Sequence, residues 1–480
     1  MNYQVNIGLE VHVELFTKTK LFCGCSTQFG APPNTQVCPI CLGLPGVLPA
    51  INKEAVKDTI ITALALNCKI SEFCRFSRKN YYYPDLPKNY QISQYDEPLA
   101  KDGYLKIVLN GKKKKIRIER IHLEEDAGKL IHGTNPEDAK FSFVDYNRTG
   151  IPLMEIVSRP DISSPEETYE YLVELRKILR YLRVSDCNME EGSLRCDANI
   201  SLNLPEEKMG TKTELKNMNS FKEIKDGLFA EIKRQSYLLS KGEKMVQETR
   251  LWDTKKKKTI SMRKKEESQD YRYFSEPDLL PLKISKEWEK SLRTSLPELP
   301  QERCQRFIRE YSLPGYDAGI ITDSRELSDY FEKCVKYYPH PKIVSNWIMG
   351  EILRLLKEKS KSIEEIKVTP EKMGKLLKEI EKGVISRNLA KNILARMFET
   401  GKSAHQIIQE QGLRQFSDKE ELKKIIKEVI KKNSEAVESF RKGKKKAIGF
   451  LIGQVMKKTQ GKANPRLVNN SLKKELEKVG

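Results

Sequence analysis

The chain begins with a regular alternation of apolar and polar residues. From Val5 to Leu15 every second residue is apolar, which predicts a β-strand with one buried face. Because strand side chains alternate between two faces, Glu10, His12 and Glu14 share the face opposite the apolar one.

A second alternation covers residues 194–202. Leu194, Cys196, Ala198, Ile200 and Leu202 face one way. The other face is polar throughout, with Ser193, Arg195, Asp197, Asn199 and Ser201. Such a face is either a functional surface or the solvated side of an antiparallel sheet, and the pattern alone does not separate these two interpretations.

The alternation slips by one residue near Arg120. Ile116 and Ile118 have one parity, whereas Ile121 and Leu123 have the other. We therefore predict a β-bulge, a feature that often re-aims side chains beside an active site. Three acids in a row, Glu124, Glu125 and Asp126, follow this strand. By themselves they fit a solvated acidic turn better than a cation site.

A further acid, Glu155, lies inside the apolar run 152–157, which predicts a strand buried on both faces. A buried carboxylate needs a partner or a metal. Glu10, His12, Glu125 and Glu155 are thus candidate ligands from three strands, and oxygen donors with one imidazole suit Mg²⁺ or Mn²⁺. The pattern does not establish that these strands are neighbours.

The order of the elements predicts an α+β protein. Residues 1–293 mix strands with helices, including one at 165–183 that Ser164 caps. Pro297 and Pro300 indicate a boundary, after which amphipathic helical patterns continue to the end. We expect three domains, 1–293, 294–404 and 405–480.

The distribution of charge distinguishes the C-terminal part of the chain from the rest. The 480 residues include 87 Lys and Arg against 67 Asp and Glu, a net charge of +20. Residues 401–480 alone hold 20 basic and 9 acidic residues, which indicates a polyanionic partner such as nucleic acid. A Lys- and Glu-rich surface of the thermophile type is the alternative. No secretory signal and no apolar run of about 20 residues is present, so we expect a soluble, intracellular protein without membrane association.

The most specific local motif consists of two closely spaced cysteine pairs. Cys23 and Cys25 precede Cys38 and Cys41, a spacing typical of a tetrahedral structural zinc site. Buried free thiols are the alternative.

Residues 76–90 interleave cations with aromatics, among them Lys79, Tyr81 and Lys88. This segment could stack a base and hold phosphates, or its tyrosines could simply pack on the sheet. No complete P-loop, nucleophile elbow or HExxH motif is found, so a nucleophilic hydrolase is poorly supported.

Together these segments resemble the GatB family, the B subunits of tRNA-dependent aspartyl/glutamyl-tRNA amidotransferases. The matching segments are 7–13, 76–94, 122–129, 144–158, 190–201, 210–221, 270–278 and 453–456, with Asn464 and Pro465. The likeness covers essentially the whole chain, and its cysteine pairs would place it in a zinc-binding subset of the family.

The resemblance implies an ATP-dependent carbon–nitrogen ligase of the bacterial cytoplasm. Such an enzyme phosphorylates the side-chain carboxylate of glutamate or aspartate misattached to tRNA(Gln) or tRNA(Asn), then amidates it. The ammonia would be channelled from a glutaminase A subunit, with a small C subunit completing a heterotrimer. The implied fold is a cradle similar to the glutamine synthetase catalytic fold over residues 1–293, then a helical domain, then a basic helical tail domain that binds tRNA.

The resemblance also implies roles for single residues. Glu10, His12, Glu125 and Glu155 would bind Mg²⁺, with Glu124 and Asp126 as alternates. Lys79 and Lys88 would lie at the channel mouth or contact phosphate. The remaining candidates for binding or orienting ATP or ammonia are Arg195, Asp197, Asn199 and Tyr81. A zinc-stabilised tRNA-binding protein without catalysis is the alternative function.

Overall fold

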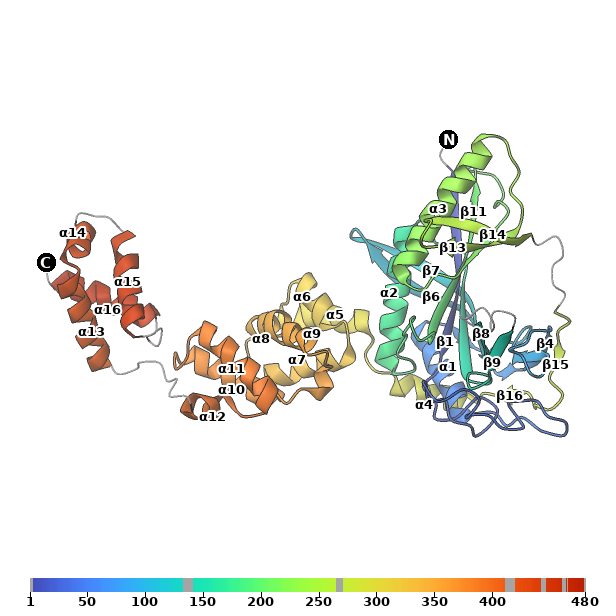
Figure 1. Ribbon diagram of the computed structural model, residues 1–480, viewed down its shortest axis with the longest axis horizontal. Coiled ribbons are helices and arrows are strands. Elements are labelled where there is room, and N and C mark those ends of the chain that lie inside the picture. Colours follow the sequence, from blue (N-terminus) through green and yellow to red (C-terminus); the bar gives the residue numbers. More distant parts are fainter. Residues whose placement is uncertain are drawn as a thin grey trace. The chain divides into compact units, whose positions relative to one another are not determined.

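The computed structural model describes residues 3–132, 141–264, 271–410, 419–441, 446–459, 463 and 465–478. The family segments that include Asp270 and Asn464 therefore extend outside the described residues. The chain divides into two units, Met1–Leu299 and Pro300–Gly480, coloured blue to yellow and yellow to red in Figure 1. None of the described helices is both long and apolar enough to cross a membrane.

A nine-stranded sheet is the main element of the first unit, in the order β14-β13-β12-β11-β1-β10-β7-β6-β2. Its strands are β1 (Gln4–Glu14), β2 (Lys69–Ile70), β6 (Ala100–Leu109), β7 (Lys112–Glu125), β10 (Pro152–Ser158), β11 (Leu194–Asn203), β12 (Thr213–Lys216), β13 (Glu248–Asp253) and β14 (Lys258–Lys264). The β12–β13 pair is parallel and the other pairs are antiparallel. The sheet is therefore mixed, and with the helices that follow it agrees with the α+β class that the order of the elements predicts.

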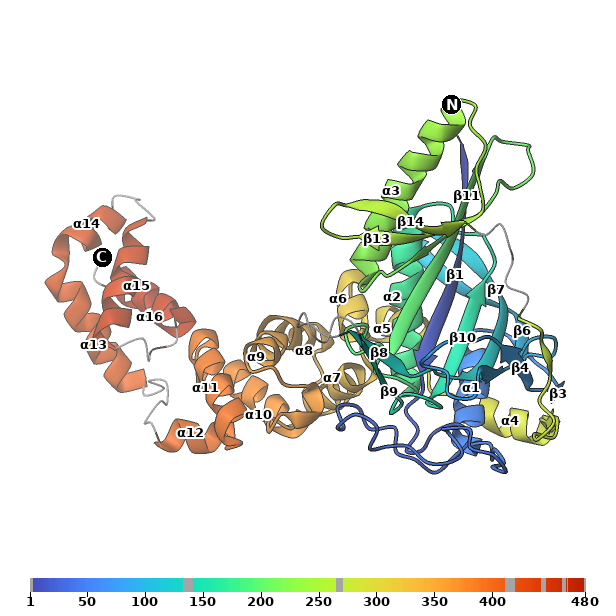
Figure 2. The same cartoon turned by 45° about the vertical axis from the view of Figure 1, so that its right-hand side comes forward.

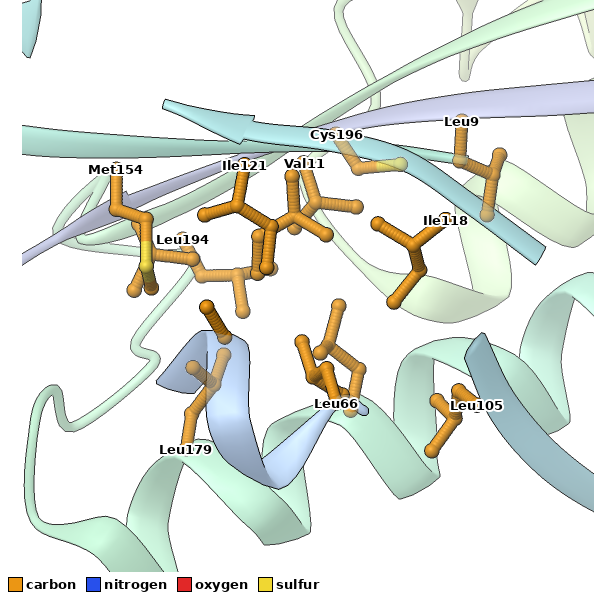
Figure 3. Close-up of a cluster of buried hydrophobic side chains, with 14 of the residues drawn as sticks. Leu9, Val11, Leu66, Leu105, Ile118, Ile121, Met154, Leu179, Leu194 and Cys196 are labelled. Atoms are coloured by element: carbon orange, nitrogen blue, oxygen red, sulfur yellow. The ribbon is translucent and has the colours of Figure 1, made fainter. Parts of the chain in front are cut away.

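One face of this sheet is covered by helices. These are α1 (Lys53–Ala65), α2 (Pro165–Leu182) and α3 (Phe221–Ser240). Ile7, Leu9 and Val11 of β1 are at most 1% exposed beneath them, so the predicted buried face of the first strand is confirmed. In Figure 3, strand residues such as Val11 and Ile121 point toward Leu179 of α2. The opposite face of the large sheet, which these helices do not cover, carries polar side chains.

The predicted bulge is present in β7. Val157 of β10 pairs with Arg120, but the next residue, Ser158, pairs with Ile118, so Glu119 is an extra residue. Ile118 and Ile121 are both fully buried in the core. Glu119 and Arg120, between them, are consequently both left outside it.

Three smaller sheets surround one end of the large sheet. They are β4 (Ser77–Asn80) with β5 (Tyr90–Ser93) and β15 (Phe274–Ser275); β3 (Phe73–Cys74) with β16 (Leu282–Lys283); and β8 (Lys129–His132) with β9 (Ser142–Asp145). The Gln91 side chain of β5 donates to the backbone carbonyl of Glu125 at 2.7 Å. This bond fixes the cation- and tyrosine-rich segment 76–90 against the end of β7.

Helix α4 (Lys286–Ser295) closes the first unit, and the expected boundary at residue 293 falls in its last turn. In the second unit, one apolar cluster joins α5 (Pro300–Tyr311), α6 (Gly315–Ile321), α7 (Arg325–Tyr337), α8 (Pro341–Trp347), a π-helical turn (Ile348–Ile352), α9 (Leu353–Glu358), α10 (Pro370–Glu381), α11 (Arg387–Thr400) and α12 (Ala404–Glu410). A separate cluster joins α13 (Lys419–Lys432), α14 (Ser434–Arg441), α15 (Lys446–Lys458) and α16 (Pro465–Lys478).

A buried carboxylate in α1 makes the stability of the first unit depend on pH. Asp58 is 8% exposed, and burial, together with the nearby charge of Glu54, raises its pKa to about 7. The folded state therefore binds this proton more tightly than the unfolded state, whose carboxyl titrates near 3.8. Stability is lost as the pH rises through that interval.

We predict that Asp58→Asn raises the free energy of unfolding by about 1–3 kcal/mol at pH 8 and much less at pH 5. Urea unfolding of the full chain at both pH values measures this. The exposed Glu54→Gln change on the same helix is the control and should leave most of the pH difference. Equal effects of Asp58→Asn at both pH values would contradict the prediction.

Candidate active site

The free face of the large sheet carries a row of charged side chains across four adjacent strands. His12 of β1 pairs with Arg195 of β11 on one side and with Glu155 of β10 on the other. Glu155 in turn pairs with His122 of β7. Figure 2 shows these four strands side by side. The structure thus establishes that the strands carrying the candidate ligands are neighbours, which the sequence left open.

Four of these side chains meet in what we call the acid–histidine cluster, formed by His12, His122, Glu124 and Glu155. The Nε2 atoms of His12 and His122 lie 3.3 and 3.2 Å from Oε2 of Glu155. His122 Nε2 is also 3.4 Å from Oε2 of Glu124. Ser93 of β5 donates a hydrogen bond of 2.8 Å to that same oxygen of Glu124.

Charge pairing keeps the cluster ionised despite its burial. Burial alone would raise the pKa of Glu155, but the charge of His122 and the hydrogen bonds from His12 and His122 hold it well below its ordinary value. The pKa of Glu124 is lowered for the same reason, chiefly by its hydrogen bond with His122. Conversely, the pKa of His122 rises to about 9, because the attraction of Glu155 and Glu124 outweighs desolvation. Two buried carboxylates therefore need two positive charges beside them.

A divalent cation fits this arrangement. One ligand atom each from His12, Glu124 and Glu155 lies within 4.8 Å of the others. Two carboxylate oxygens and one imidazole nitrogen form a donor set that suits Mg²⁺ or Mn²⁺. Among the described residues the buried Nδ1 of His122 has no hydrogen-bond partner, so this ring is held only through its Nε2.

The structure does not bring Glu125, one of the four expected ligands, into this cluster. His122 and Glu124 share one face of β7, so Glu125, one residue further, lies on the other face. There its Oε1 pairs with the Lys88 ammonium and accepts a hydrogen bond of 2.9 Å from the Ile92 backbone. Of the three adjacent acids, Glu124 is the one beside His12 and Glu155.

Glu10 and Asp126 also have partners of their own. Glu10 accepts a hydrogen bond of 2.8 Å from the Asn199 side chain and is not part of the close set of ligand atoms. Asp126 pairs with Arg195, while Arg148 lies 3.6 Å away. Burial raises the pKa of neighbouring Glu14 to about 8, assisted by the charge of Asp126.

The polar side chains of β11 form ion pairs and an amide hydrogen bond with neighbouring strands. Asp197 pairs with Lys216 of β12, whose ammonium also lies 3.2 Å from Glu214. Together with Arg195 and Asn199, these groups extend the polar row from the acid–histidine cluster toward β12. The three predicted residues of this strand thus lie on the same face as His12.

Lys79 and Tyr81 lie at the edge of the cluster on the segment docked against β7. The Lys79 ammonium is 5.7 Å from the ring centre of Tyr81 and 4.9 Å from that of Tyr271. Burial opposes its charge, but Glu124 keeps the pKa of Lys79 above its ordinary value. Tyr81 packs edge-on against Tyr271, whereas Tyr82 is 75% exposed. Tyr81 thus packs within the protein, whereas the next tyrosine of the run faces outward.

The four motif cysteines lie together, as their spacing predicts. Sγ atoms of Cys23, Cys25, Cys38 and Cys41 are all within 4.8 Å of one another, so the group could hold a metal ion. A hydrogen bond from the Cys23 thiol, and the charge of Lys20, lower the pKa of Cys41 to about 5.

This cysteine cluster is adjacent to the Lys88–Glu125 ion pair. A cavity of about 90 Å³ is lined by Cys23 and Cys41 on one side and by Lys88 and Glu125 on another. The sequence pattern gave no sign of this proximity, because the cysteines and Glu125 are far apart along the chain.

Sequence reasoning did not assign a role to His122, Ser93 or Arg120. His122 had a detectable signal, since it lies two residues before Glu124 and shares its face. Ser93 had none, because its contact with Glu124 depends on how β5 docks against β7.

The Lys88–Glu125 pair is buried, with side chains 8% and 3% exposed, so the loss of one partner should lower the stability of the fold. Lys88→Met leaves Glu125 charged and without its ammonium partner, which should cost about 3–5 kcal/mol of unfolding free energy. The double variant Lys88→Met/Glu125→Leu should recover at least half of that loss. Urea unfolding of the two single variants and the double variant measures the coupling, and additive losses would contradict it.

Comparison with known proteins agrees with this architecture. Residues 5–290 match the family model described as the GatB/GatE catalytic domain, and residues 329–476 match the model described as the GatB domain. A protein from Thermodesulfovibrio yellowstonii is 57% identical over 477 residues, which cover 99% of this chain and 100% of that protein. One from Moorella thermoacetica is 56% identical over 477 residues, again 99% and 100% of the two chains. Both are named as the B subunit of an aspartyl/glutamyl-tRNA(Asn/Gln) amidotransferase, and the chain belongs to this GatB family.

Proposed function

We propose that the chain is the subunit that activates and amidates aspartate or glutamate misattached to tRNA(Asn) or tRNA(Gln), using ATP and Mg²⁺. Full-length similarity to proteins named as B subunits of this amidotransferase supports the overall reaction. The observation that carries the chemical assignment is the acid–histidine cluster, where two ionised carboxylates and two histidines are buried side by side.

The chemistry required is the conversion of a carboxylate into an amide. A carboxylate is a poor acyl donor, so its oxygen first attacks the γ-phosphorus of ATP, which releases ADP and leaves an acyl phosphate. Ammonia then attacks the acyl carbon and phosphate leaves. Mg²⁺, when bound, would neutralise charge on the phosphates. His12, Glu124 and Glu155 are the residues that would hold it.

The other residues of the polar face would orient the reactants. Lys79 lies beside Glu124 at the edge of the cluster and supplies a positive charge for the phosphates. Arg195 and Asp126 form a fixed ion pair at the neighbouring end of the row. Lys88 and Glu125 lie on the other side of β7, in the small cavity beside the cysteines, and are candidates for guiding ammonia to the site.

We further propose that the cysteine cluster binds a structural Zn²⁺. Four thiolate donors from one loop region would fill the coordination of a Zn²⁺ ion, which suits a structural role and not catalysis. The ion would fasten residues 23–41 beside the end of β7, where Lys88 and Glu125 lie.

The proposed reaction requires partner subunits and a segment that binds tRNA. The chain would act with a glutaminase A subunit and a small C subunit, which supply ammonia in a cytoplasmic heterotrimer. The basic segment 401–480 would hold the tRNA through phosphate contacts, which position an RNA without reading its sequence. A similarity of the first unit to the glutamine synthetase catalytic fold, and domain limits at 1–293, 294–404 and 405–480, remain part of this proposal.

We predict that Glu124→Gln lowers the rate of ATP-dependent amidation at least about 100-fold, because it removes a ligand charge from the cluster. The assay is amidation of misacylated tRNA by the complete enzyme complex over a range of Mg²⁺ concentrations. Binding of the tRNA should be unchanged. The exposed Glu72→Gln is the control for a lost carboxylate, and it should retain full activity. Full activity of Glu124→Gln would favour the alternative, a zinc-stabilised tRNA-binding protein without catalysis.

For the cysteine cluster we predict one zinc ion per chain by elemental analysis of the purified protein. Cys25→Ser should lower the zinc content well below one, since serine does not replace a thiolate ligand. Cys304→Ser, in the second unit, is the matched control and should keep the ion. Stoichiometric zinc in Cys25→Ser, or none in the parent protein, would contradict the assignment.

A further inference from the structure

The end of β7 is held by a strand that belongs to a different sheet. Strand β6 pairs with β7 only as far as Ile121, so the same edge of β7 takes its next hydrogen bonds from elsewhere. Strand β5 supplies them with side chains. Gln94 Oε1 accepts from the Leu123 N–H at 3.1 Å, and Gln91 donates to the Glu125 carbonyl at 2.7 Å. These four residues are at most 6% exposed, so the docking of β5 on β7 is buried.

The same strand also contacts two adjacent carboxylates that lie on opposite faces of β7. On the cluster face, the Ser93 hydroxyl donates to Oε2 of Glu124 at 2.8 Å. On the other face, the Ile92 N–H donates to Oε1 of Glu125 at 2.9 Å, and this oxygen also pairs with Lys88. Two consecutive residues of β5 thus bond the acid–histidine cluster and the Lys88–Glu125 pair at the same time.

Ser93 orients the Glu124 carboxylate within the cluster. Oε2 of Glu124 accepts the Ser93 hydrogen bond and lies 3.4 Å from Nε2 of His122. Oε1 faces His12, whose Nε2 is 4.0 Å away. Carboxylates that bind a metal are commonly held by a second hydrogen bond of this kind, which fixes the direction of the ligand oxygen. Ser93 therefore controls the orientation of a proposed Mg²⁺ ligand.

Strand β5 is connected to charged residues on both sides of β7. Lys88 precedes its first residue, Tyr90, by two positions. Gln91 is paired with Lys79 of β4, which lies beside Glu124. Because closely packed interiors transmit displacements, β5 cannot move relative to Glu124 without also moving relative to Glu125.

We propose that Ser93 is a positioning residue that couples the cation site to the Lys88–Glu125 pair through β5. A cation held by Glu124 fixes that carboxylate, so the Ser93 hydrogen bond persists and β5 opens less often, including at Ile92. Linkage requires the converse, that the same hydrogen bond raises the affinity for the cation. The inference rests on the proposed function, in which the cluster activates the substrate and the Lys88–Glu125 pair guides ammonia. It adds a connection between these two sites.

Cation affinity tests the first part. Mn²⁺ is titrated into the complete enzyme complex without nucleotide or tRNA, and free Mn²⁺ is followed by its electron paramagnetic resonance signal. Ser93→Ala should weaken Mn²⁺ binding at least about tenfold, whereas Ser93→Thr, which keeps the hydroxyl, should stay within about threefold of the parent. Ser71→Ala is the matched control, because it removes a serine hydrogen bond of 2.7 Å to the Pro98 carbonyl and should not change the affinity.

Amide hydrogen exchange tests the coupling. A buried amide exchanges only when its segment opens, and the Ile92 amide reports on the face that carries Glu125. Saturating Mn²⁺ should slow exchange of the peptide that covers β5 by about fivefold or more in the parent complex. In Ser93→Ala, at a Mn²⁺ concentration that saturates its weaker site, the slowing should be less than about twofold.

Parent-like Mn²⁺ affinity in Ser93→Ala would overturn the proposal, and so would slowing of exchange as large as in the parent. If Ser93→Ala does not fold, Ser93→Thr and Ser93→Val provide the test, because these two side chains have the same shape and differ in the hydroxyl. Equal affinities in that pair would also overturn it. Neither measurement needs turnover, so failure here differs from failure of the proposed function, which would appear as a parent complex that binds Mn²⁺ but does not amidate tRNA.

Discussion

The register of β1 against its two neighbours is the constraint on which the rest of the site depends. A shift of one residue on either side would move His12 away from Glu155 or Arg195 and would turn the apolar residues of β1 out of the core. The core face fixes this register, since Ile7, Leu9 and Val11 are buried beneath three helices. Packing on one face of the sheet thus positions the charges on the other.

Those charges are costly to bury, and the cluster compensates for the cost locally. Glu124 and Glu155 lie in a sheet whose other face is apolar, where an unpaired carboxylate would be strongly disfavoured. His12, His122 and Lys79 provide positive charge around them. This local pairing leaves neither carboxylate of the cluster without a positive partner.

Much of this architecture could be predicted from periodicity, and the exceptions have a physical reason. Alternation predicted β1, β11 and the bulge, and the cysteine spacing predicted a cluster that the structure places within 4.8 Å. The structure places Glu124, and not Glu125, beside His12 and Glu155. The parity of Ile121 and Leu123 already assigns Glu125 to their own face of the strand. In contrast, no local pattern could place Ser93 beside Glu124 or Cys41 beside Glu125, because these contacts depend on how distant segments dock.

The bulge at Glu119 makes the length of β7 as important as its composition. Before the bulge, Ile116 and Ile118 face the core. After the bulge, Ile121 and Leu123 face the core. His122 and Glu124 consequently face the cluster. Removing a single residue here would shift the alternation of the strand. Ile116 and Ile118 could then remain in the core only if His122 and Glu124 no longer faced the cluster. We therefore expect relatives to vary the residue at the bulge more readily than the number of residues between 116 and 124.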